Sequence, residues 1–215
     1  MKVGTDAVLL GAWAEVTGAK KILDIGTGCG VIALMLAQRT DDVVRIDAIE
    51  IGKEDFVQAQ ENISNSHWQN KISVFHNSVQ EFDPTHRYDL IVSNPPYFIN
   101  SLLPPAQHRM RSRHTRSLTF EELLVHSVRM LKPSGKLAVI LPFREGNNFK
   151  SLAAKNGLHV SKQLAVYSKK EKPQMRWLLE FGFATYRSKK KKIILYKKDT
   201  LKSKAYDNLT HDFYL

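Results

Sequence analysis

Cysteine is almost absent from this chain of 215 residues, which contains Cys29 alone. A single cysteine excludes an internal disulfide and any metal site built from clustered cysteines, and it is typical of a protein in a reducing compartment. The chain also lacks an apolar run of about 18 residues, and its first residues lack the apolar core of a signal peptide. We therefore expect a cytoplasmic protein with no membrane span.

Internal repeats and long low-complexity segments are missing as well. Hydrophobic residues make up 43% of the chain and charged residues 25%, which is average for a globular protein and argues against a disordered or coiled-coil chain. A chain of this length buries roughly 70% of its extended surface when it folds as one unit. The composition predicts a single domain over residues 1–215, without a metal site, and a monomer is favoured.

Acidic residues are outnumbered: Asp and Glu total 21 against 32 Lys and Arg, a net charge of +11. The excess concentrates in a basic C-terminal part, residues 168–215. A basic field of this size attracts polyanions, of which nucleic acid is the commonest. For the run Lys189–Lys192 taken alone, a solvated turn remains an open alternative.

Short apolar runs alternate with helical patterns along most of the chain. Residues 31–38 and 53–64 have helical spacing, and a third helix opens at Thr119, where Glu122 completes a capping box; the segment Lys132–Gly135 marks its end. Alternation of this kind predicts an α/β fold with a mostly parallel sheet. The expected buried strands are residues 21–25, 43–50, 72–76, 88–93 and 136–141.

The last third of the chain has a different pattern. Residues 158–166, 176–185 and 192–196 are expected to form strands, and no full crossover helix separates the last two. Because a parallel connection needs such a crossover, an antiparallel hairpin is expected to finish the sheet.

A glycine-rich turn joins the first strand to the first helix. It follows Asp24 and contains Gly26, Gly28 and Gly30. Position 31 is Val where a dinucleotide fingerprint requires glycine, and no Gly-Lys-Ser/Thr follows to hold a triphosphate. A second acid, Glu50, ends the next strand, where it is placed to accept hydrogen bonds from the two hydroxyls of a ribose. The order of strand, acid, turn, helix, strand and acid predicts a nucleoside-containing cofactor.

A second motif, Ser93-Asn94-Pro95-Pro96-Tyr97, directly follows the fourth strand. The prolines hold the backbone extended, so that the Asn94 amide oxygen and the Pro95 carbonyl form a pair of acceptors for a planar NH₂ group. Two acceptors on its hydrogens favour the pyramidal form of such an amine, which can attack a methyl sulfonium. Tyr97 supplies a face on which a base can stack. We expect Asn94, Pro95 and Tyr97 to be the catalytic residues; a surface turn is the alternative.

The segment Asp24–Gly30 together with Glu50 resembles the S-adenosylmethionine site of class I methyltransferases. The resemblance implies a Rossmann-like, seven-stranded sheet that ends in an antiparallel hairpin. It also implies that the loop and Asp24 hold the methionine part of the cofactor and that Glu50 holds the ribose, with Asn94 adjoining the cofactor. The Asp that usually meets the adenine is replaced here by Asn77 and Ser78, which can accept the same hydrogen bond or form an ordinary turn.

The Asn-Pro-Pro-Tyr motif resembles that of amino-methyltransferases, and the whole chain resembles the bacterial tRNA adenine-N6 methyltransferases that act beside the valine anticodon. That family begins with a further segment upstream. The resemblance implies methyl transfer from S-adenosylmethionine to an adenine of tRNA, with Lys2 and Thr5 closing over the cofactor. Capping by Thr5 or Asp6 of a helix that begins near Ala7 is the alternative for that segment. The segments that carry the resemblance are residues 1–6, 9–13, 34–39, 58–62, 205–206 and 213–215.

A basic loop over residues about 98–118 follows the second motif and contains four arginines and no acid. Contact with tRNA phosphates is the preferred interpretation, and a solvated loop is the alternative. The histidines in this loop have no carboxylate or cysteine partner, so no metal site is expected. The expected RNA-binding residues are Arg109, Arg111, Arg113 and Arg116.

Two other functions remain open at this stage. A glutamine N5-methyltransferase of translation release factors shares the Asn-Pro-Pro-Tyr motif, although it normally carries a separate helical N-terminal domain. A catalytically silent RNA-binding module would keep the fold and the basic surface, and intact Asn94 and Glu50 argue against it.

Overall fold

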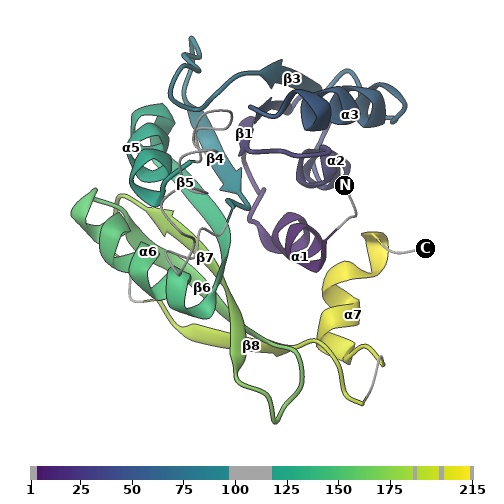
Figure 1. Ribbon diagram of the computed structural model, residues 1–215, viewed down its shortest axis with the longest axis vertical. Helices are drawn as coiled ribbons and strands as arrows, with labels where there is room; N and C mark the ends of the chain where they lie inside the picture. Colours follow the sequence, from purple (N-terminus) through teal and green to yellow (C-terminus); the bar gives the residue numbers. More distant parts are fainter. Residues whose placement is uncertain (1–3, 97–117, 186–187, 199–200, 214–215) are drawn as a thin grey trace, which may run out of the picture.

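The computed structural model describes residues 4–96, 118–185, 188–198 and 201–213. These residues form three layers, in which one sheet of eight strands is covered by helices on both faces (Figure 1). The predicted Rossmann-like α/β class with a mostly parallel sheet is confirmed. Within these residues, no helix is long and apolar enough to span a bilayer.

The sheet has the strand order β3-β2-β1-β4-β5-β7-β6-β8. The first five of these strands are parallel, β7 is antiparallel to both of its neighbours, and β8 is parallel to β6. The strands are β1 (Lys21–Ile25), β2 (Arg45–Glu50), β3 (Ile72–His76), β4 (Tyr88–Ser93), β5 (Leu131–Pro142), β6 (His159–Tyr167), β7 (Gln174–Gly182) and β8 (Lys190–Ile194).

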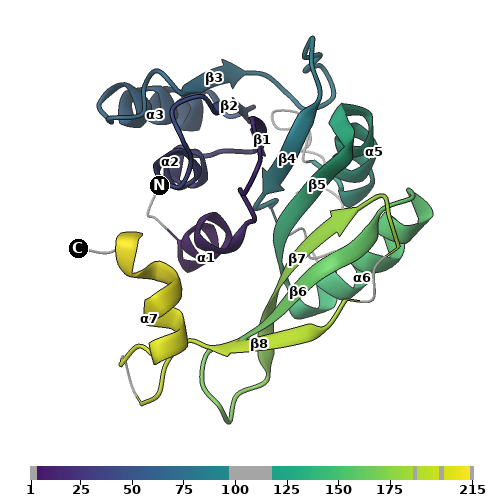
Figure 2. The same cartoon turned by 180° about the vertical axis from the view of Figure 1, so that it is seen from behind.

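Helices cover each face of the sheet (Figure 2). On one face lie α1 (Thr5–Trp13), α2 (Val31–Gln38), α3 (Lys53–Ser64) and α7 (Lys204–Thr210), the last followed by a 3₁₀ turn at His211–Phe213. On the other face lie α5 (Phe120–Met130) and α6 (Phe143–Lys155).

Burial on both faces explains why the strands read as continuous apolar runs. Neighbouring residues of a strand point to opposite faces. In β1, Ile22 therefore packs into the core beneath α1 and α2, whereas Leu23 packs into the core on the α5 and α6 side, and both are fully buried. A parallel sheet covered on both sides requires apolar residues at successive positions.

The end of the sheet differs from the prediction. The antiparallel hairpin is formed by β6 and β7, not by the last two strands. After β7 the chain passes the start of β6 and adds β8 in parallel to its outer side, where Gln163 pairs with Lys190 and Tyr167 with Ile194. The sheet therefore has an eighth strand beyond the seven expected. Lys190–Lys192 are exposed residues of this edge strand, so the solvated-turn alternative is wrong for them.

Local signals located both ends of α5 but not the cap of α1. The capping box at Thr119 is confirmed, with its hydroxyl accepting the Glu122 N–H at 3.1 Å. Helix α5 ends at Met130, directly before Lys132–Gly135, so the prediction that this segment marks the end of the helix is confirmed; the segment itself belongs to β5. Helix α1 begins at Thr5 with Gly4 as the N-cap, so the alternative of a cap by Thr5 or Asp6 on a helix that begins near Ala7 is wrong.

Candidate functional site

The candidate site lies where β1, β2 and β4 end. Because these strands are parallel, their carboxyl ends share one edge of the sheet, and Ile25 pairs with both Ile49 and Ser93. The Ser93 hydroxyl donates a hydrogen bond of 2.9 Å to the Ile25 carbonyl oxygen. The glycine loop and Asn94 therefore leave the sheet side by side, as in other open α/β sheets, whose ligands bind at this edge.

The three glycines of the loop all adopt left-handed backbone conformations. Their φ angles are 71° at Gly26, 57° at Gly28 and 84° at Gly30, a region that L side chains rarely adopt. The Gly26 N–H is bound by the Ile49 carbonyl oxygen at 2.9 Å. A Cβ atom on Gly30 would lie 3.3 Å from Ile63 of α3. The loop thus needs glycine both for its turns and for its close packing.

Asp24 lies fully buried at the end of β1. Its Oδ2 accepts a hydrogen bond of 2.6 Å from the Thr27 hydroxyl, whereas Oδ1 accepts none of good geometry within the described residues. Burial raises the pKa of Asp24 to about 7, against the opposing effect of Thr27 and with a smaller contribution from Glu50. A buried acceptor of this kind is suited to a ligand that brings a positive charge.

Glu50 is held by two backbone N–H groups. Its Oε2 accepts from Gly28 at 2.9 Å and its Oε1 accepts from Gly52 at 2.8 Å. Each carboxylate oxygen can accept a further hydrogen bond, because an ionised carboxylate offers about four lone-pair positions. The side chain is therefore fixed beside the glycine loop with capacity left for two hydroxyl donors.

Asn62 of α3 is a site residue that the sequence reasoning missed. Its side-chain amide donates a hydrogen bond of 2.8 Å to the carbonyl oxygen of Cys29, inside the glycine loop. Its own oxygen accepts from Gln58 at 3.2 Å, one turn earlier on the helix. The sequence did contain one signal for this role. Asn62 is a polar residue next to the buried positions Ala59 and Ile63, which form the face of α3 that packs against the protein.

Asn77 and Ser78 follow β3, next to Glu50, and the Asn77 N–H is bound by the Glu50 carbonyl oxygen at 3.1 Å. The Asn77 side-chain oxygen accepts the Ser78 N–H at 2.8 Å, and the Ser78 hydroxyl accepts the Glu81 N–H at 3.2 Å. Both side chains thus stabilise a local turn at the edge of the site. This is the geometry of the turn alternative, and the turn lies beside Glu50.

Asn94 is half-buried, Pro95 is buried and Pro96 is exposed. The chain thus emerges at the sheet edge directly after the buried Ser93, and Asn94 stands at the boundary between the core and the surface. An asparagine at such a boundary is supported by the core and is still within reach of a substrate.

The start of helix α1 is bound to strand β7. Arg176 of β7 donates from Nε to Oδ2 of Asp6 at 2.8 Å, and Arg176 pairs with Pro142 at the carboxyl end of β5. The exposed Thr5 at the start of α1 is therefore held on the side of the sheet where the candidate site lies. The expected site residues Lys2, Tyr97, Arg109, Arg111, Arg113 and Arg116 lie outside the described residues.

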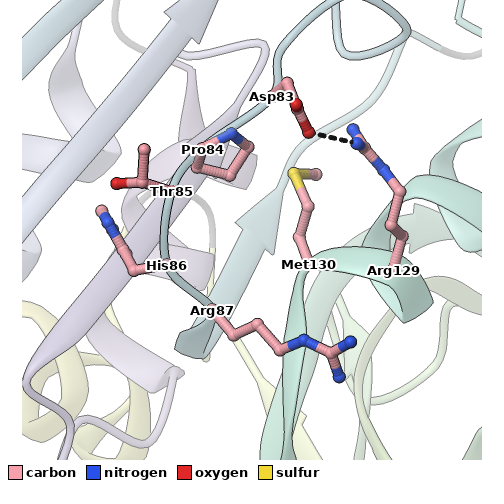
Figure 3. Close-up of a pocket in the computed structure, with 7 residues that line it drawn as sticks. All are labelled: Asp83, Pro84, Thr85, His86, Arg87, Arg129 and Met130. Atoms are coloured by element: carbon pink, nitrogen blue, oxygen red, sulfur yellow. Dashed lines mark hydrogen bonds and ion pairs between the residues drawn. The ribbon is translucent and has the colours of Figure 1, made fainter.

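A hollow lies at the opposite edge of the sheet, where β4 begins (Figure 3). It has a volume of about 290 Å³, and an ion pair of 2.7 Å between Asp83 and Arg129 lies at its wall. None of the expected site residues that the structure describes lines it, so it is separate from the described part of the candidate site. In the described part of the chain, no three potential metal-binding side chains come together. The lining residues are Asp83, Pro84, Thr85, His86, Arg87, Arg129 and Met130.

Comparison with solved structures supports the fold. A predicted O-methyltransferase from Agrobacterium tumefaciens superimposes with a TM-score of 0.74 at 16% identity, covering 96% of this chain and 96% of that one. A glycopeptide N-methyltransferase whose structure contains S-adenosylmethionine has a TM-score of 0.60 at 11% identity and covers 85% of this chain and 89% of that one. At such identities the likeness shows a shared fold.

Comparison with protein sequences is more specific. The profile of the methyltransferase small domain matches residues 3–150. The tRNA1(Val) (adenine(37)-N6)-methyltransferase of Tolumonas auensis is 42% identical over the full chain, which spans 90% of that relative. The enzyme of the same name from Dyadobacter fermentans is 45% identical over 84% of this chain and 75% of the relative. The chain therefore belongs to the methyltransferase small domain family and, within it, to the family of tRNA1(Val) (adenine(37)-N6)-methyltransferases.

Proposed function

We propose that this protein transfers the methyl group of S-adenosylmethionine to the N6 amine of adenine 37 in tRNA1(Val). The observation that carries the proposal is the position of Asn94 and Pro95 directly beside the glycine loop, fixed by the bond between Ser93 and Ile25. This arrangement brings a pair of acceptors for an amine next to a site for a nucleoside-containing methyl donor.

The described residues fit this cofactor. The unpaired Oδ1 of buried Asp24 offers an acceptor for the amino group of the methionine part, whose positive charge would lower the raised pKa of Asp24. Glu50 has capacity left for both ribose hydroxyls. Gly26, Gly28 and Gly30 let the backbone approach the ligand without Cβ atoms. When bound, S-adenosylmethionine supplies an electrophilic methyl group.

The adenine of the cofactor is assigned to the turn at Asn77 and Ser78. The turn lies beside Glu50, as the bond from the Asn77 N–H shows. Its side-chain oxygens can still accept from an exocyclic amine, because each has a second lone pair. Lys2 and Thr5 are proposed to close over the cofactor, and the position of Thr5 at the start of α1 supports this.

At the target, Asn94 and Pro95 hold the adenine amine. Its two hydrogens are donated to the Asn94 side-chain oxygen and the Pro95 carbonyl oxygen, which moves the nitrogen lone pair out of conjugation with the ring. The nitrogen lone pair would then be directed at the methyl carbon of the sulfonium, the sulfur would keep the electron pair of the broken carbon–sulfur bond and leave as a neutral thioether, and the surplus proton of the methylated amine would pass to solvent. Tyr97 is proposed to stack on the base. Catalysis then consists of positioning and electrostatic stabilisation.

The tRNA itself is proposed to contact the basic loop. Its residues Arg109, Arg111, Arg113 and Arg116 follow the Asn94 motif in sequence, so phosphates that flank the target base are the nearest polyanionic groups. Replacing all four with Gln should flatten the salt dependence of tRNA binding and leave the affinity for S-adenosylmethionine unchanged.

The test is methyl transfer to a defined RNA. The purified chain should transfer tritium from labelled S-adenosylmethionine to an unmodified tRNA1(Val) transcript, and mass spectrometry of the digest should show N6-methyladenine at position 37. A transcript with guanine at position 37 is the matched control and should accept no label. Transfer to a release-factor glutamine instead would support the rival enzyme, and binding of tRNA without transfer would support the silent module; either result would overturn the proposal.

A further inference from the structure

Two lysines from different elements meet over the ring of Trp177. The Nζ atom of Lys150, on α6, lies 3.5 Å from the ring centroid, and the Nζ atom of Lys190, on β8, lies 4.9 Å from it. Trp177 is buried in the core, with 3% of its surface exposed, and its own N–H donates to Asn147 at 3.1 Å. The ring therefore forms a fixed platform for both ammonium groups.

Among the described residues, this pair of cations has no counter-charge. In the part of the chain that the structure describes, no carboxylate lies within ion-pair distance of Lys150 or Lys190. Within the described ranges, the hydrogen bond of Lys150 goes to the neutral side-chain oxygen of Gln163, at 3.0 Å. Burial and the nearby charge of Lys190 lower the pKa of Lys150 to about 8. The two ammonium groups thus repel each other, and a bound anion would remove this repulsion.

The two lysines and Trp177 lie near the edge of the sheet that holds the candidate site, where the parallel strands have their carboxyl ends. Trp177 pairs with Leu141, two residues beyond Val139, which is the partner of Ser93. Strand spacing therefore places Trp177 roughly 10 Å sideways from Ser93 and about 7 Å further toward the carboxyl edge. Lys190 pairs with Gln163 on β6, and β8 is the outer strand of the sheet (Figure 2).

We propose that Lys150 and Lys190, held on Trp177, bind one backbone phosphate of the tRNA while the target adenine lies at Asn94. The inference rests on the proposed function, because tRNA is the polyanion that must approach this edge. Two ammonium groups can donate several charge-assisted hydrogen bonds to the oxygens of one phosphate. Lysines on an edge strand also prevent strand pairing with other molecules. That role explains the exposed Lys191, but it does not explain why a lysine from α6 converges with one from β8.

The experiment measures the binding of unmodified tRNA1(Val) transcript over a series of salt concentrations. Log affinity falls as log salt rises, and one lost phosphate contact should make this negative slope shallower by about 0.7–0.9. The double variant Lys150→Gln/Lys190→Gln should show this change. The control Lys20→Gln/Lys155→Gln makes the same charge change at exposed positions where β1 begins and α6 ends, and it should keep the wild-type slope. The charge-preserving variant Lys150→Arg/Lys190→Arg should also keep it. An unchanged slope in the Gln variant would overturn the proposal.

A second measurement separates phosphate contact from a purely structural role. The pKa of Lys150, followed by NMR of its ammonium group, should rise when the transcript binds, whereas lysines that only shield Trp177 would show no response. The methylation rate at saturating tRNA should be unchanged in the Gln variant, with KM raised. Methylation by the wild type together with an unaffected slope in the variant would overturn this inference alone. Loss of slope without any methylation by the wild type would overturn the proposed function alone.

Discussion

The side-chain amide of Asn62 is bonded to the carbonyl oxygen of Cys29, and this contact fixes the glycine loop from outside. Thirty-three positions separate the two residues, so the bond links α3 to a loop that the sequence places one strand and one helix earlier. Asn62 touches no reacting group in this arrangement. It is a positioning residue for the loop.

Replacing Asn62 with Ala should weaken the binding of S-adenosylmethionine by about 1–2 kcal/mol, because the Cys29 carbonyl loses its partner and the loop loses a support. Calorimetry with the cofactor measures this directly. Gln58→Ala removes only the group that orients Asn62 and should have a smaller effect. Equal affinities for wild type and Asn62→Ala would show that the loop holds its shape without α3.

Glu50→Ala should weaken S-adenosylmethionine binding by about 1.5–3 kcal/mol, the contribution of charge-assisted hydrogen bonds to the ribose, while the fold is retained. Glu61→Ala, at an exposed position of α3, is the matched control and should bind as the wild type does. Unaltered calorimetric affinity in the Glu50 variant would rule out the assignment of the ribose to this carboxylate.

Asn94→Ala should lower the rate of methyl transfer about 10²-fold or more with nearly unchanged cofactor affinity, because the lost acceptor acts mainly in the transition state. Asn94→Asp keeps an acceptor and should retain more activity than the Ala variant. Single-turnover kinetics on saturating tRNA measures the rate. If Asn94→Ala turns over nearly as fast as the wild type, the catalytic role given to this residue is wrong.

The raised pKa of Asp24 predicts a pH dependence of stability. The folded-state pKa is about 7 against an ordinary value of 3.8, so the folded state binds more protons than the unfolded state between these pH values. The free energy of unfolding should therefore fall as the pH rises from about 4 to about 7, by up to about 4 kcal/mol. Urea denaturation across this range measures the fall, and Asp24→Asn should reduce it. If the free energy of unfolding falls equally with pH in the wild type and in Asp24→Asn, a group other than Asp24 causes the fall.

The parts of the fold that follow from local signals could be predicted. Apolar runs marked β1 to β4, and the capping box at Thr119 marked the start of α5 within one residue. The order of acid and glycine along the chain likewise located the candidate site, because parallel strands bring their carboxyl ends together regardless of details elsewhere. These features depend on residues close in sequence or on the general geometry of α/β folds.

The features that escaped prediction are set by distant partners. The residues Lys190–Lys192 look like a solvated turn in isolation, and only pairing with β6 makes them a strand. Asp6 looks like a capping residue, but its carboxylate is taken by Arg176. The role of Asn62 depends on where α3 packs, which no local pattern specifies. In each case the contact that determines the role joins two segments far apart in the sequence, and local patterns do not predict which distant segments meet.

The ion pair between Asp6 and Arg176 can form only late in the synthesis of the chain. The two residues are 170 positions apart, so their contact closes a loop of most of the chain and carries the entropic cost of that closure. While the ribosome has made only the segment up to β5, α1 has no arginine to hold its start. The glycine loop and Asn94 can therefore be in place before Asp6 gains its partner, and the start of α1 acquires this ion pair only when β7 has been added.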